Sequence, residues 1–289
     1  MSHAHAGSQR RVIIALVLTG TFMLVEIVGG IISGSLALLA DAGHMLTDTM
    51  ALGLAATAFH VSKRPPDGRL TYGYQRFQIL AAFVNGLSLL AIVGWIVFEA
   101  FRRFMQPQDI LAGTMLVVAG AGLIVNLIAF GVLHTGDRDN LNIRGAALHV
   151  AGDLLGSIAA IVAALVIIKT GWTLIDPLLS LAVAGLILKS AWMLVKRSGH
   201  VLLEGAPEWL DVDAMQDNLV SRIPEVSSIH LVHVWGLTPQ DLMMTMHVSV
   251  DGEPTNPTSV IRRVKALLRE DYGIGHSTIE IEAEVCADH

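Results

Sequence analysis

The spacing His-x-x-x-Asp occurs twice in this chain, and these four residues are the most suited to chemistry. His44 and Asp48 lie in one apolar stretch, and His149 and Asp153 lie in another. A spacing of four places both side chains on one face of a helix, one turn apart. Two such faces brought together offer two imidazole nitrogens and two carboxylate oxygens, a set that suits tetrahedral Zn²⁺. We therefore predict a metal site between two helices.

The alternative is that these residues are polar groups that hold the helices together, or one coupled ion pair. A charged residue at the centre of a bilayer costs about 2.5–3.5 kcal/mol on insertion scales. Four ionisable groups at similar depth therefore need a compensating ligand, and the repeat on two helices favours the metal site.

Three more polar residues lie in apolar stretches. Asp41 precedes His44 by three residues and shares its helix face. Two roles stay open for Asp41: a group that supports the ligands or attracts cations, or an interfacial residue near the start of a helix. Glu26 and Asn126 are expected to face the inside of the helix bundle, and the sequence assigns them no role.

The composition indicates which elements must position these residues. The chain has 289 residues, of which 53% are hydrophobic and 15% charged, against about 25% charged residues in soluble domains. Residues 1–199 hold 14 Lys+Arg and 10 Asp+Glu, whereas residues 200–289 hold 5 and 15. This split predicts an N-terminal tail over residues 1–11, a membrane domain over 12–199 and a soluble, acidic C-terminal domain over 200–289.

The same counts exclude some functions. The acidic tail has no basic patch, which argues against nucleic acid as a partner. The single Cys286 excludes an intramolecular disulfide and a zinc cluster made of cysteines.

Six apolar stretches are each close in length to the roughly 20 residues that a helix needs to cross the hydrocarbon core of a bilayer. They are Val12–Ile32, Leu36–Val61, Ile79–Phe101, Leu111–Leu133, Gly145–Ile168 and Ile175–Val195. With both ends of the chain in the cytoplasm, inner segments hold ten Lys and Arg residues and outer segments three. This bias predicts that both termini are cytoplasmic, and we expect a bacterial inner (plasma) membrane.

Two features concern the packing of these helices. The glycines of the fourth stretch (Gly113, Gly120, Gly122 and Gly131) are expected to let helices approach closely. Asp176-Pro177 is typical of a helix start, where the Asp side chain caps the helix and Pro occupies its first position.

The tail changes periodicity near residue 200. Helices are predicted over Asp211–Ile223 and Thr258–Glu270, and strands over Val226–Leu237, Leu242–Val250 and Ser277–Glu284. The order predicts a small α+β domain with an open sheet. His247 shares a strand face with Thr245 and Ser249, and His233 alternates on the more apolar face of its strand. From spacing alone, scattered surface or core histidines are the better interpretation.

Several runs resemble the cation diffusion facilitators. They are Ser35–Asp48, Arg69–Arg76, His149-x-x-x-Asp153 and Asp176–Ser180. The resemblance covers essentially the whole chain. It implies a homodimeric, proton-coupled exporter of divalent metals, with six membrane helices and a ferredoxin-like (metallochaperone-like) cytoplasmic domain.

The resemblance also implies site residues. The transport ligands are then His44, Asp48, His149 and Asp153, and His at position 44 favours Zn²⁺, with Cd²⁺ as a second cargo. A cytoplasmic zinc site is implied at His233, His247, His276 and Glu282. The pattern departs from some members in the loop after the second helix, where Asp67 has no His partner and is expected to be a turn residue.

The residues also bear on two other functions. A metalloenzyme within the membrane needs an open coordination position and a general base; no His-Glu-x-x-His motif occurs, and Asp41 is the one spare carboxylate near the predicted ligands. A membrane-bound zinc sensor or structural metal-binding protein stays open from sequence, and zinc uptake by vesicles distinguishes it from a transporter.

Overall fold

The computed structural model describes residues 2–62, 64–134, 141–238, 241–251 and 256–283. The chain divides into two compact units. The first comprises residues 1–54 and 84–195, and the second comprises residues 55–83 and 196–289. Each unit is described by itself below.

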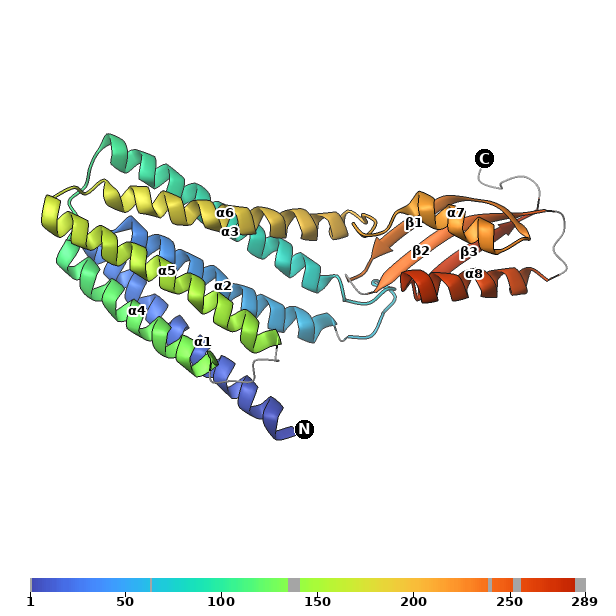
Figure 1. Cartoon of the computed structure of the whole chain (residues 1–289), viewed down its shortest axis with the longest axis horizontal. Coiled ribbons are helices and arrows are strands. Elements are labelled where there is room, and N and C mark those ends of the chain that lie inside the picture. Colours follow the sequence, from blue (N-terminus) through green and yellow to red (C-terminus); the bar gives the residue numbers. More distant parts are fainter. Residues whose placement is uncertain (1, 63, 135–140, 239–240, 252–255, 284–289) are drawn as a thin grey trace. The chain divides into compact units, whose positions relative to one another are not determined.

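Six long helices precede the tail (Figure 1). They are α1 (Ser2–Ser33), α2 (Leu36–Ser62), α3 (Phe77–Met105), α4 (Ala112–His134), α5 (Leu141–Thr170) and α6 (Ile175–Leu202). In the described residues, four of them contain segments long and apolar enough to cross a membrane, and Val17–Ser33 of α1 is a shorter apolar segment. Helix α1 runs without a break through residues 11 and 12, so the tail boundary placed there stays a prediction.

The first turns of α2 contact two groups of helices in the first unit, because apolar residues lie on two sides of this helix. Leu36 and Ala40 pack with residues of α3 and α6, whereas Ala37 and Leu38 pack with residues of α4, α5 and the start of α6. Many of these buried residues are alanines, which let helix backbones approach without loss of packing. The first turns of α2, which lead to the first His-x-x-x-Asp motif, thus lie between two groups of helices.

The tail elements form where the sequence predicts them. They are α7 (Val212–Arg222), β1 (Val226–Gly236), β2 (Leu242–Val250), α8 (Pro257–Tyr272) and β3 (His276–Glu282). Asp211 caps α7 by accepting a hydrogen bond from the backbone N–H of Ala214, and Asn256 caps α8 in the same way through Ser259. Helix α8 ends at Gly273, whose φ of 65° lies in the left-handed region that glycine adopts without strain.

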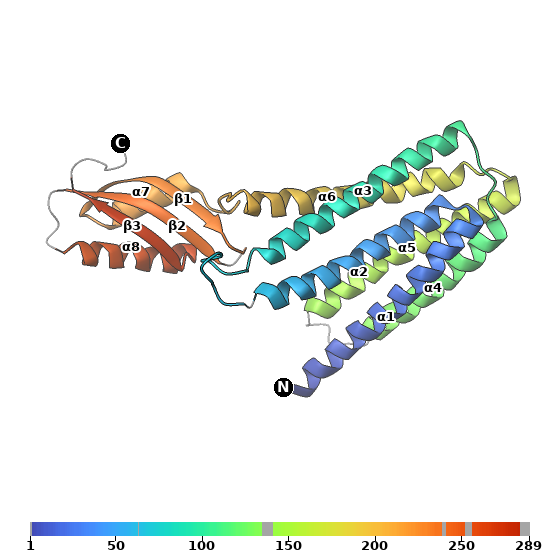
Figure 2. The same ribbon diagram turned by 180° about the vertical axis from the view of Figure 1, so that it is seen from behind.

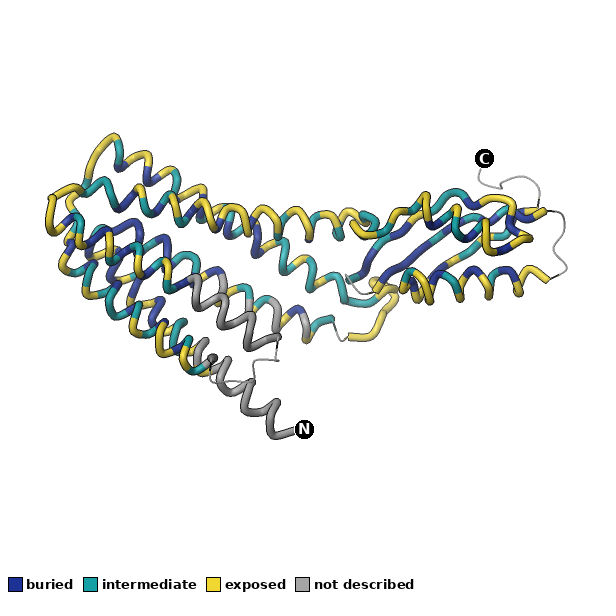
Figure 3. Tube along the Cα trace, in the orientation of Figure 1, coloured by how far each residue is buried: buried dark blue, intermediate teal, exposed yellow. Residues whose placement is uncertain are grey.

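The three strands form one sheet in the order β1-β2-β3, with β1 antiparallel and β3 parallel to β2 (Figure 2). Alternate residues of β2, such as Met244, Met246 and Val248, are buried against apolar residues of α7 and α8. Figure 3 marks the buried residues of the sheet and of these two helices. The other β2 residues, including Thr245, His247 and Ser249, lie on the opposite face, away from that core. The predicted fold class, a helical membrane domain with an α+β tail, is confirmed.

Candidate metal sites

Helices α2 and α5 touch at a residue without a side chain. A Cβ placed on Gly156 of α5 would lie 2.5 Å from Oδ1 of Asp41 in α2, which is closer than real Cβ atoms approach another atom. Only glycine therefore leaves room for the Asp41 carboxylate at this point. The two helices lie side by side in both views (Figures 1 and 2).

This contact brings the two motifs to the same level. The start of α2, at Ala37 and Leu38, packs with the later part of α5, residues 160–167, so the helices run antiparallel. From the contact, three residues forward along α2 lead to His44, and three residues back along α5 lead to Asp153. The next turn in the same direction leads to positions 48 and 149. The backbone thus pairs the two His-x-x-x-Asp motifs turn by turn.

The side chains of two predicted ligands are described. Asp153 is buried and 2% exposed, and His44 is half-buried. The side chains of Asp48 and His149 lie outside the described part of the structure, although their backbone belongs to α2 and α5. The four-ligand set therefore stays a prediction that the register of the helices supports.

Glu26 and Asn126, to which the sequence assigns no role, lie in this part of the bundle. Glu26 of α1 is fully buried, and a Cβ on Gly122 of α4 would lie 2.9 Å from its Oε1. One turn further along α4, the amide of Asn126 donates a hydrogen bond to the hydroxyl of Ser157, next to Gly156 on α5. The sequence places Glu26 and Asn126 in apolar helices, but it does not indicate that they lie near the metal-binding motifs.

Asp176 does not cap its own helix as the sequence suggests. Its carboxylate accepts hydrogen bonds from the hydroxyl of Ser35 at 2.6 Å and from the backbone N–H groups of Leu36 and Ala37 at 2.7 and 3.2 Å. Asp176 therefore caps α2 from the first turn of α6. The expectation failed because the N–H groups that a buried carboxylate satisfies need not belong to its own helix.

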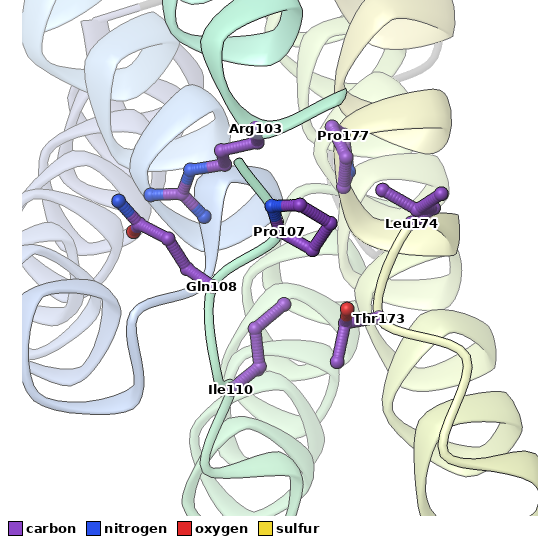
Figure 4. Close-up of a pocket in the computed structure, with 7 residues that line it drawn as sticks. All are labelled: Arg103, Pro107, Gln108, Ile110, Thr173, Leu174 and Pro177. Carbon is purple, nitrogen blue, oxygen red and sulfur yellow. The ribbon is translucent and has the colours of Figure 1, made fainter. Parts of the chain in front are cut away.

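A buried arginine extends this network to α3. The guanidinium of Arg103 lies 3.4 Å from Asp176 and 3.2 Å from Glu99, and it donates a hydrogen bond to the carbonyl of Gly34 at 2.5 Å. Figure 4 shows a hollow beside Arg103, lined largely by Pro107, Ile110, Leu174 and Pro177. Its other lining residues are Gln108 and Thr173. Among the described residues, no carboxylate lines the hollow, so it lacks the charged oxygen ligands of a cation site. The network of Arg103, Asp176 and Glu99 links the start of α2 to the end of α3 and the start of α6.

In the second unit, Asp67 organises the loop between α2 and α3. Oδ1 of Asp67 accepts hydrogen bonds from the backbone N–H groups of Arg69 and Leu70, and Oδ2 accepts one from the hydroxyl of Tyr74 at 2.6 Å. The bond from Tyr74, together with those from the two backbone groups, holds the pKa of Asp67 below its ordinary value. Both oxygens accept hydrogen bonds within the loop, in agreement with the expectation that Asp67 is a turn residue.

The tail gathers three metal-binding side chains on the face of the sheet opposite the helices. They are His230 of β1, His247 of β2 and Glu282 of β3, with one ligand atom of each within 4.8 Å of the others. The two oxygens of Glu282 lie 2.8 Å from Nδ1 of His247 and 3.1 Å from Nε2 of His230. Glu282 is 7% exposed. Two imidazoles and a buried carboxylate provide three of the four ligands of a tetrahedral zinc site.

His233 and His276, which the resemblance implies as ligands, lie elsewhere on this face. His233 pairs with Thr245 and His276 pairs with Met243, and both histidines are exposed. Neither belongs to the cluster of His230, His247 and Glu282. Their role as ligands stays a prediction.

An irregularity in β1 explains why His230 was missed. In a regular strand, residues 230 and 233 point to opposite faces. Between them the register shifts, and Leu231 has a φ of 47°, so His230 and His233 face the same side. A positive φ at a leucine has no local sequence signal, and strict alternation cannot place both His230 and His233 on the face that carries His247.

Comparison with known proteins gives consistent matches over both units. The family profile described as the cation efflux transmembrane domain matches residues 12–203, and the profile of the cation efflux protein cytoplasmic domain matches residues 207–284. The zinc transporter ZitB of Pectobacterium atrosepticum is 49% identical over 99% of this chain and 89% of its own length.

Two further relatives have broader names. The metal cation efflux system protein CzcD of Cupriavidus metallidurans is 41% identical over 99% of this chain and 90% of its own. A Bacillus velezensis protein named as a cadmium, cobalt and zinc/H⁺-K⁺ antiporter is 40% identical over 97% of this chain and 91% of its own.

Proposed function

Because the chain belongs to the cation efflux family, whose members are also called cation diffusion facilitators, we propose that it exports Zn²⁺ from the cytoplasm in exchange for protons. The observation that carries the proposal is the contact of Asp41 with Gly156, because it sets the two His-x-x-x-Asp motifs level with each other. The names of the relatives, a zinc transporter and metal cation efflux proteins, support zinc or another divalent metal as the cargo.

The proposed transport site consists of His44, Asp48, His149 and Asp153. A neutral imidazole and an ionised carboxylate are the forms that bind metal, so zinc binding releases protons and protonation releases zinc. The reference pKa of His, about 6.5, makes the imidazoles the groups most ready to exchange protons near neutral pH. Access from each side in turn requires only that the helices around this site rearrange.

Protons are the proposed driving ion because zinc export is uphill electrically. Moving one charge across 100 mV takes about 2.3 kcal/mol, so carrying Zn²⁺ out of an inside-negative cell takes about twice that. Inward protons supply this energy. The name of the Bacillus velezensis relative includes H⁺ and K⁺ as exchanged ions, which supports a cation antiport of this kind.

Zinc uptake by proteoliposomes tests the proposal. We expect time-dependent accumulation that a pH gradient drives, and we expect Asp153→Ala to abolish it. Leu155→Ala is the matched control, because Leu155 is 63% exposed on the same helix and should transport at the wild-type rate. Stoichiometric zinc binding without accumulation in the wild type would instead support a membrane-bound sensor or structural zinc protein.

For the tail, we propose a regulatory zinc site at His230, His247 and Glu282, on a domain that mediates a homodimer. The close approach of the three side chains supports the site. Zinc binding to the full chain carrying Asp153→Ala isolates the tail from the transport site. On this background, His230→Ala should weaken zinc binding about tenfold or more. A smaller loss in His233→Ala would place His233 outside the site, and an equal loss would add it to the ligands. Unchanged zinc binding in His230→Ala would refute the site.

A further inference from the structure

The proposed antiport needs groups that hold the exchanged protons. Helix α1 contains a candidate, Glu26, that is not one of the four proposed ligands. Glu26 is fully buried, and neither of its carboxyl oxygens has a hydrogen-bond partner among the described residues. A buried polar group without a partner costs free energy, and a buried charge costs far more unless it is paired. The form of Glu26 that this environment favours is therefore the neutral, protonated acid.

No cationic side chain among the described residues pairs with the carboxyl group of Glu26. Helix α4 contributes no titratable side chain over residues 112–132, and its contact with Glu26 is Gly122, where a Cβ would lie 2.9 Å from Oε1. Among the described titratable groups, those on other helices that act on Glu26 are Asp41 of α2 and Asp153 of α5, and both are acids.

The amide oxygen Oδ1 of Asn126 also has no described hydrogen-bond partner, although this residue is fully buried. Gly122 and Asn126 lie one turn apart on α4, and Gly156 and Ser157 are neighbours on α5. Glycines thus make room for Glu26 and Asp41 where two helices could otherwise carry side chains. The carboxyl groups therefore occupy the places where side chains of α4 and α5 would otherwise lie.

We propose that Glu26 carries one of the exchanged protons, and that it releases this proton when Zn²⁺ binds at the level of Asp153. This proposal rests on the proposed function and adds to it a proton-carrying residue outside the four ligands. Zinc brings two positive charges next to the acids, so the ionised form of Glu26 becomes favourable only when the metal is bound. The O–H bond of the carboxyl group then breaks, the electron pair stays on the carboxylate, and the proton passes to solvent water. When zinc leaves, a proton from solvent restores the acid.

Calorimetric titration of the purified full chain with zinc, in buffers of different ionisation enthalpy, counts the protons released per zinc bound. We expect Glu26→Gln to bind zinc and to release up to one proton fewer than the wild type. Glu26→Asp is the matched control, because it keeps a titratable group, and it should release as many protons as the wild type. In proteoliposomes, Glu26→Gln should keep zinc flux down a zinc gradient and should show less accumulation driven by a pH gradient than the wild type, because one exchanged proton fewer is coupled to each zinc ion.

The possible outcomes separate this inference from the proposed function. If the wild type releases no protons on binding zinc, the antiport itself is wrong. If the wild type releases protons and Glu26→Gln releases the same number, only the role of Glu26 is refuted. A Glu26→Gln protein that does not fold would also contradict the proposal, because the amide has nearly the shape of the protonated acid and no charge.

Discussion

At the scale of single residues, the choice of His or Asp at position 44 should set metal preference. Replacing His44 with Asp exchanges a nitrogen ligand for a harder oxygen at the proposed transport site. We expect His44→Asp to weaken the discrimination between Zn²⁺ and Cd²⁺. Uptake of the two metals by the same vesicles measures the ratio of their rates. An unchanged ratio would mean that selectivity depends on other residues.

Residue types and local spacing predicted many residues of the candidate sites, but not all of them. The His-x-x-x-Asp motifs are visible in the sequence because a helix turns by a constant angle. His230 is not visible in this way, since its place beside His247 and Glu282 depends on the irregular backbone at Leu231. The sequence also does not show that Glu26 lies near the metal-binding motifs. Asp41 and Asp153, which act on Glu26, belong to other helices that only the tertiary fold brings together.

At the scale of helices and strands, apolar length and caps predicted the elements well. The strand Leu242–Val250 and the cap at Asp211 lie where the sequence places them, because both depend on neighbouring residues. The role of the glycines in α4 was predicted only in part. Gly122 lies against Phe22 and Glu26, whereas Gly113, Gly120 and Gly131 have no described atom within 4 Å of a Cβ. Spacing alone cannot distinguish a glycine at a contact from one that faces lipid.

A pair of alanine variants on α4 tests this difference. Gly120→Ala should stabilise the protein by about 0.5–1 kcal/mol, because alanine loses less conformational entropy in a helix. Gly122→Ala gains the same term, but its methyl group displaces the ring of Phe22 and the carboxyl group of Glu26. Such overpacking costs about 1–3 kcal/mol. Thermal unfolding in one detergent should therefore rank Gly120→Ala above the wild type and Gly122→Ala at or below it. The reverse order would contradict the α1–α4 contact.

The cap that α6 supplies to α2 gives a second prediction at this scale. Asp176→Asn turns one acceptor of the cap into a donor and removes the charge beside Arg103. We expect a loss of about 3 kcal/mol, the low end for one member of a buried ion pair, since Arg103 keeps Glu99 and the carbonyl of Gly34. Arg102→Gln, which removes the exposed partner of Glu99, should cost less than about 1 kcal/mol, because Glu99 keeps its pair with Arg103. Equal changes in unfolding temperature would show that the Asp176 network does not stabilise the bundle.

At the scale of the whole molecule, the acidic tail should respond to zinc as a dimer. Residues 200–289 hold 15 acidic and 5 basic side chains, so two facing copies repel each other and bound cations relieve the repulsion. Spin labels on the tail of the full-length protein should therefore move closer when zinc is added, and His247→Ala should weaken the response. The same variant should lower the apparent zinc affinity of transport without abolishing it. Label distances that do not change with zinc, together with unaltered transport in His247→Ala, would refute this role.

The network of Asp176 and Arg103 also gives α2 the geometry of a lever whose pivot is at Leu36. At about 1.5 Å per residue, His44 lies about 12 Å from this pivot and position 48 about 18 Å. A tilt of 10° about the pivot would carry these positions through arcs of about 2 and 3 Å. A zinc–ligand bond is itself only about 2.0–2.2 Å long. A rotation of this size about the tied end of α2 is thus large enough to make or break the coordination of an ion at the proposed site between α2 and α5.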